Sequence, residues 1–64
     1  MNAQIRATEF RIFSEVHTEL RHAMNTHDRR TAWLAIEELR GIQEHTEWIA
    51  LRARCAAALS EYVH

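Results

Sequence analysis

The chain has 64 residues and a mass of 7.6 kDa, which is enough for one small domain over residues 1–64. Eight basic residues, all of them arginine, oppose nine acidic ones, and this balance argues against a broad basic surface for nucleic acid or a polybasic membrane anchor. Apolar residues make up 47% of the sequence, too many for a disordered tail, but they occur in runs too short for a membrane span or a signal peptide.

The spacing of the apolar residues is helical throughout, and with no proline and one glycine the chain has too few turn residues for a sheet. The sequence therefore predicts an all-α fold of three helices. The first helix is expected over about residues 3–24, with Asn2 as its candidate N-cap. Its apolar face carries Ile5, Phe10, Ile12, Phe13, Val16, Leu20, Ala23 and Met24.

A second helix is expected over about residues 29–40, after a turn in which Thr26 or Asp28 suits the N-cap position. Gly41 is predicted to end this helix, because glycine adopts the left-handed conformation of a Schellman motif without strain. The inner face of the helix carries Ala32, Ala35, Ile36 and Leu39.

The third helix is expected over about residues 43–62, so the predicted lengths are long, short and long. Its apolar face carries Trp48, Ile49, Leu51, Cys55, Ala56, Leu59, Tyr62 and Val63. Short connections between neighbouring helices predict an up-down-up bundle. Because the second helix is too short to cover the apolar faces of the other two, and because so small a chain is marginally stable alone, we expect a homodimer packed through helices 1 and 3.

Four polar side chains interrupt the apolar faces: Glu9 and His17 on the first helix, His45 and Arg52 on the third. Burying an unpaired charge is costly, so Glu9 and Arg52 are expected to pair across the bundle, within one chain or between two. Two interpretations remain open, a structural ion pair that fixes the helix register and a polar pocket for an anionic or peptide ligand. His17 is interpreted as a core histidine or as part of a pH-sensitive interface.

The sequence offers little material for catalysis or for a cofactor. Glu19 with His22 and Glu61 with His64 match the Glu-x-x-His spacing of di-iron bundles, but Glu19 and His22 fall on the outer face of their helix. Cys55 has no neighbouring base and lies on an apolar face, where a small buried side chain is the simpler interpretation. We therefore predict no enzyme activity, no cofactor and no metal site.

Large apolar side chains provide the candidate contacts with partners. Trp48 is expected in the core, whereas Trp33 either caps the core or stands exposed beside Arg29 and Arg40 as an anchor for a partner. Leu34 projects from the polar face of its helix. The full set of candidate interface residues is Phe10, Phe13, Leu20, Trp33, Leu34, Trp48, Leu51, Leu59 and Tyr62.

These patterns favour a non-enzymatic interaction module of the cytoplasm, a dimer that regulates or inhibits another protein. One alternative is a transcription-associated protein that contacts DNA or a DNA-binding regulator. The acidic Glu44 and Glu47 argue against direct DNA contact, because they begin the helix that would face phosphates. A second alternative is a bundle that binds a metal or small ligand. The bias toward arginine and alanine, both encoded by GC-rich codons, fits a bacterial or phage source.

Overall fold

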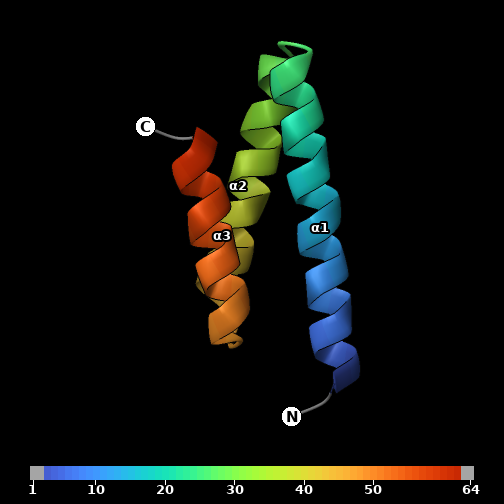
Figure 1. Cartoon of the computed structure of the whole chain (residues 1–64), viewed down its shortest axis with the longest axis vertical. Helices are drawn as coiled ribbons and strands as arrows, with labels where there is room; N and C mark the ends of the chain where they lie inside the picture. Colours follow the sequence, from blue (N-terminus) through green and yellow to red (C-terminus); the bar gives the residue numbers. More distant parts are fainter. Residues whose placement is uncertain (1–2, 63–64) are drawn as a thin grey trace.

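The computed structural model describes residues 3–62, which form three helices: α1 (Ala3–Asn25), α2 (Arg29–His45) and α3 (Ile49–Tyr62). The predicted all-α bundle is confirmed, and no strand occurs within the described residues. Figure 1 shows the chain reversing direction after α1 and again after α2. The predicted N-cap Asn2 and the predicted core residue Val63 lie outside the described part of the chain.

The predicted order of lengths, long, short and long, is wrong. The helices have 23, 17 and 14 residues, so α2 is longer than expected and α3 is the shortest. The cause is Gly41, which has no positive φ and lies inside α2 instead of ending it. The chain leaves α2 at Thr46, whose backbone is extended (φ −73°, ψ 141°) and whose N–H still donates to the Ile42 carbonyl at 2.9 Å. Continuing the helix through Gly41 keeps Ile42 packed against the core.

Gly41→Ala should raise the free energy of unfolding by about 0.5–1 kcal/mol, because glycine inside a helix loses more backbone entropy on folding than alanine does. A Cβ built at Gly41 meets no other atom within 4 Å, so the added methyl group causes no clash. Urea denaturation followed by circular dichroism measures the change. A loss of stability would contradict a helical Gly41 and would restore the left-handed helix end predicted from the sequence.

The predicted left-handed helix end does occur, but at the α1–α2 turn and on His27. His27 has φ of 59°, its N–H donates to the Met24 carbonyl at 3.4 Å, and the next N–H, of Asp28, donates to the Ala23 carbonyl at 2.9 Å. This is the hydrogen-bond pattern of a Schellman motif.

Asp28 then caps α2, as one of the two predicted N-cap residues. Its carboxylate accepts hydrogen bonds from the Thr31 N–H at 3.1 Å and from the Thr31 hydroxyl at 2.7 Å. The bond from the Thr31 hydroxyl and that from the backbone hold the pKa of Asp28 below its usual value. The turn at residues 26–28 is thus fixed on both sides, by the end of one helix and by the start of the next.

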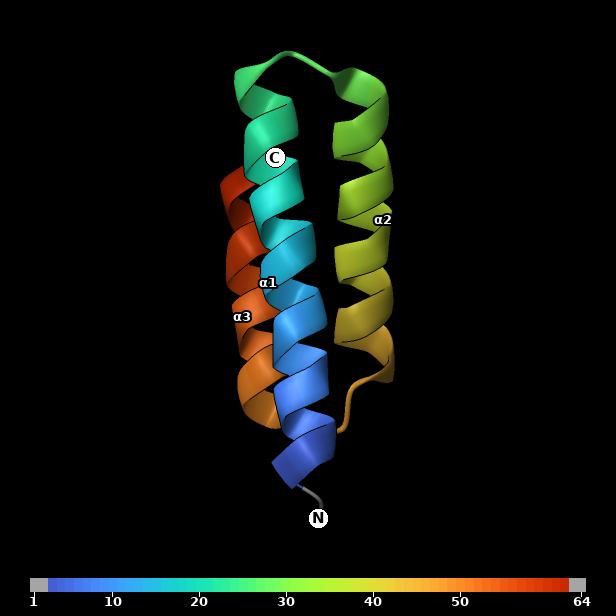
Figure 2. The ribbon, with the colours of Figure 1, turned by 90° about the vertical axis from the view of Figure 1, so that its right-hand side faces the viewer.

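The core lies along α2, which packs against both other helices. In Figure 1, α2 stands behind and between α3 and α1, and Figure 2, seen from the α1 side, shows α2 to the right of α1 and α3 partly behind α1. The buried apolar residues are Phe13, Val16, Leu20, Ala23, Ala32, Ala35, Leu39, Leu51, Cys55 and Ala58. Phe13, Leu20 and Leu51 were expected at an interface with a partner, but they are buried within the single chain and have almost no surface to offer. They belong to one core cluster with Ala35 and Leu39 of α2 and Cys55 of α3, so the single chain covers them.

Charged side chains recur along each helix, so none of them, over residues 3–62, has the unbroken apolar length that a bilayer crossing requires.

Candidate functional site

Thr46, in the connection between α2 and α3, joins all three helices through hydrogen bonds. Its hydroxyl donates to Oε2 of Glu9 on α1 at 2.8 Å and accepts from the N–H of Trp48 at 3.1 Å. Its carbonyl accepts from Nη2 of Arg52 on α3 at 2.7 Å. Thr46 is only 5% exposed, so these bonds satisfy polar atoms that water hardly reaches.

The expected pair of Glu9 and Arg52 is therefore indirect: among the described contacts, both side chains meet at Thr46 rather than at each other. Sequence reasoning missed Thr46 because its position was assigned to the interior of a helix. The available signal was the residue type, since a threonine hydroxyl commonly accepts the N–H two residues ahead in a turn. His45 is exposed beside this network and lines a small hollow with Glu9, Ile12, Ile42 and Thr46.

A row of aromatic rings fills the space between α1 and α3. Trp48 lies 6.4 Å from Phe10 between ring centroids, and Phe10 lies 6.1 Å from Phe13. His17 continues the row, 5.5 Å from Phe13 and edge-on to Tyr62 at 6.4 Å. The rings connect α1 and α3, whose backbones lie close together at few positions. The prediction that Glu9, His17, His45 and Arg52 form a buried polar layer is wrong: His45 and Arg52 are exposed and Glu9 and His17 are half-buried. Glu9, His45 and Arg52 lie near Thr46, and His17 lies among the aromatic rings.

Two arginines cover the exposed end of this row. The guanidinium carbon of Arg6 lies 5.4 Å from the centre of the Trp48 ring, and that of Arg54 lies 5.2 Å from the Phe10 ring. Both distances are within the range of cation–π attraction. Phe10 and Trp48 are thereby partly shielded from water by the aliphatic and cationic parts of the arginine side chains.

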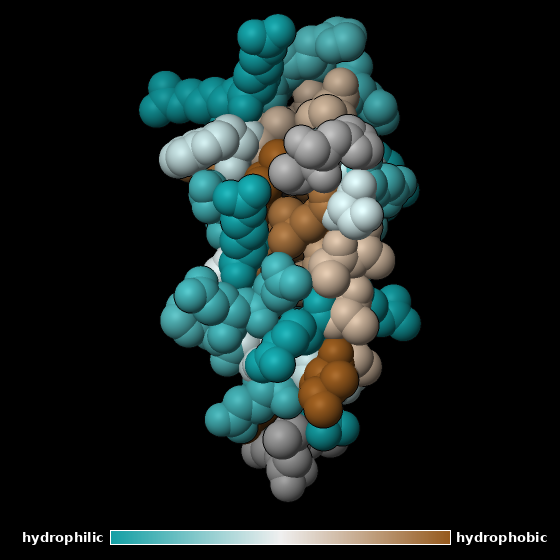
Figure 3. Space-filling model, turned by 90° about the vertical axis from the view of Figure 1, so that its left-hand side faces the viewer, coloured by the Kyte–Doolittle hydropathy of each residue, from teal (hydrophilic) through white to brown (hydrophobic). Residues whose placement is uncertain are grey.

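The outward side of α3 is an exposed apolar face, which we call the α3 outer face. Ile49 is 78% exposed, and the other members are small: Ala50, Ala53, Ala56 and Ala57. Figure 3, which views the molecule from the α3 side, shows a column of moderately apolar surface with a strongly apolar patch near its lower end. Leu59 and Tyr62, also predicted as interface residues, are half-buried and pack against the core.

A second apolar surface lies between α1 and α2 near the turn that joins them. It is a hollow of about 280 Å³ lined mainly by Ala23, Met24, Ala32, Trp33 and Ile36, with His27, Asp28 and Arg29 at its edge. Trp33 is 60% exposed, which places it among the exposed side chains rather than over the core. Leu34, on the same helix, is exposed but outside this hollow.

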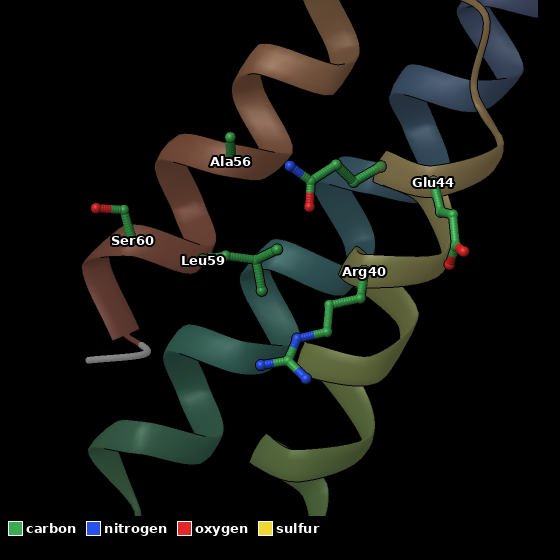
Figure 4. Close-up of a pocket in the computed structure, with 6 residues that line it drawn as sticks. Arg40, Glu44, Ala56, Leu59 and Ser60 are labelled. Carbon is green, nitrogen blue, oxygen red and sulfur yellow. The ribbon is translucent and has the colours of Figure 1, made fainter.

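A groove of about 630 Å³ lies between α2 and α3. Figure 4 shows Arg40 and Glu44 on one side and Ala56, Leu59 and Ser60 on the other. The groove is open to solvent, and its Arg40 guanidinium also lies 3.9 Å from a carboxylate oxygen of Glu37. An open groove excludes little water, so it gives a polar substrate no desolvated environment for catalysis.

Groups able to perform covalent or metal chemistry are not gathered in the described part of the chain. Cys55 is fully buried, and burial raises the pKa of its thiol, which keeps it in the less reactive protonated form. Over residues 3–62, no three histidine, cysteine or carboxylate side chains lie close enough together to hold a metal ion. His64, half of one Glu-x-x-His pattern, lies outside these residues.

No family model, no curated protein and no solved structure matches the chain. A functional proposal therefore rests on the surfaces and contacts of the bundle.

Proposed function

We propose that this protein is a non-enzymatic interaction module of the cytoplasm that pairs with a second copy of itself and regulates or inhibits another protein. The observation that carries the proposal is the α3 outer face. α3 buries Leu51, Cys55 and Ala58 on its inner side, yet its outer side is also apolar. Contiguous exposed apolar surface is typical of a contact with another protein, so the outer face calls for a covering partner.

A second copy is the partner that the α3 outer face fits best. Four alanines leave a flat surface on which another helix backbone approaches closely, and Ile49 adds a large apolar group at one end. Arg52 and Arg54 lie in the first half of α3 and Glu61 near its end, so an antiparallel pairing sets opposite charges beside each other. The proposed contact extends to Phe10 of α1, next to Arg54, and so involves helices 1 and 3 of an up-down-up bundle.

Sedimentation velocity at low micromolar concentration tests the pairing with two matched variants. Ala57→Glu places a charge on the α3 outer face, and Ala7→Glu places the same charge on the exposed outer side of α1. We expect the wild type and Ala7→Glu to sediment as dimers, and Ala57→Glu to weaken dimerisation at least about tenfold, because a desolvated charge costs more than 1.4 kcal/mol. A monomeric wild type, or dimers of equal strength in both variants, would contradict the proposal.

A transcription-associated role remains the second candidate, and one observation favours it. Arg6, Arg52 and Arg54 gather around the Trp48 end of α3, with two of them stacked on aromatic rings. Arginine beside exposed aromatic rings is a common arrangement for binding nucleic acid. Gel-shift measurements over a salt series test it, since contacts with phosphate weaken steeply as salt rises. Binding that is absent at low salt would exclude direct contact and leave only a regulator as the target.

A further inference from the structure

We draw no further inference here: the strongest candidate, the hollow between α1 and α2 that Trp33 lines, carries Arg29 and Asp28 together at its edge, so its charges select no occupant and nothing in the structure shows what covers it.

Discussion

Leu39→Ala is expected to lower the free energy of unfolding by about 2–5 kcal/mol, the range found when a buried leucine is truncated. Leu39 is 0% exposed and lies on α2, the helix that packs against both of the others. A chain of this length is expected to have a total stability of only about 3–10 kcal/mol. The substitution therefore removes a large part of the stability, and the variant is expected to be partly unfolded at room temperature.

Leu34→Ala provides the matched control for Leu39→Ala. It makes the same chemical change in the same helix, but at a position that is 46% exposed, so the expected loss is under about 0.5 kcal/mol. Urea denaturation at a fixed protein concentration compares the two variants. If Leu39→Ala does not fold, Leu39→Met provides a milder change with an expected loss below about 1.5 kcal/mol. Equal losses at positions 34 and 39 would contradict the position of Leu39 at the centre of the core.

The existence of the helices and the identity of the core residues were predictable because they depend on periodicity. Ala32, Ala35 and Leu39 were expected on the inner face of α2, and all three are buried. The helix ends were less predictable, because glycine permits a left-handed conformation without requiring it. The chain uses its left-handed residue at His27, where the α1–α2 turn demands one, and leaves Gly41 in an ordinary helical conformation.

The position at which α2 ends also bears on the expected pairing of two copies. A short second helix made the apolar faces of the first and third helices seem too wide for one chain, and Phe13, Leu20 and Leu51 were counted as surplus. In the structure those side chains are enclosed in one core cluster that all three helices share. The periodicity of a helix shows the width of its apolar face, but the lengths of its neighbours decide how much of that face is covered. Among the described residues, the large apolar side chains that stay exposed are Ile5, Phe10, Ile12, Met24, Trp33, Leu34 and Ile49.

The polar network near α3 was predictable in part. The positions of Glu9 and Arg52 on apolar faces correctly indicated that both reach toward the same region. Their meeting point was not predictable, because it depends on the backbone leaving the helical conformation at Thr46. Only with an extended Thr46 does its carbonyl become available to Arg52 while its hydroxyl lies between Glu9 and the N–H of Trp48.

Thr46→Val is expected to lower the free energy of unfolding by about 1–3 kcal/mol. Valine has nearly the shape of threonine but lacks the hydroxyl, so Oε2 of Glu9 loses its donor and the N–H of Trp48 loses its acceptor. Removing one partner costs the desolvation of the groups left behind, and here the hydroxyl serves two of them. Thr46→Ser keeps the hydroxyl and is expected to retain most of the stability.

A double-mutant cycle with Glu9→Ala and Thr46→Val shows whether this loss comes from the network or from local packing at the helix end. If the Glu9 carboxylate and the Thr46 hydroxyl act together, the double variant should lose less stability than the two single variants combined, with a coupling of at least about 0.5 kcal/mol. Urea denaturation of the four proteins under one set of conditions gives the coupling. Strictly additive losses would mean that Glu9 contributes nothing through Thr46, and α1 would then be held to the α2–α3 connection by contacts such as those of Phe10 and Arg6 with Trp48.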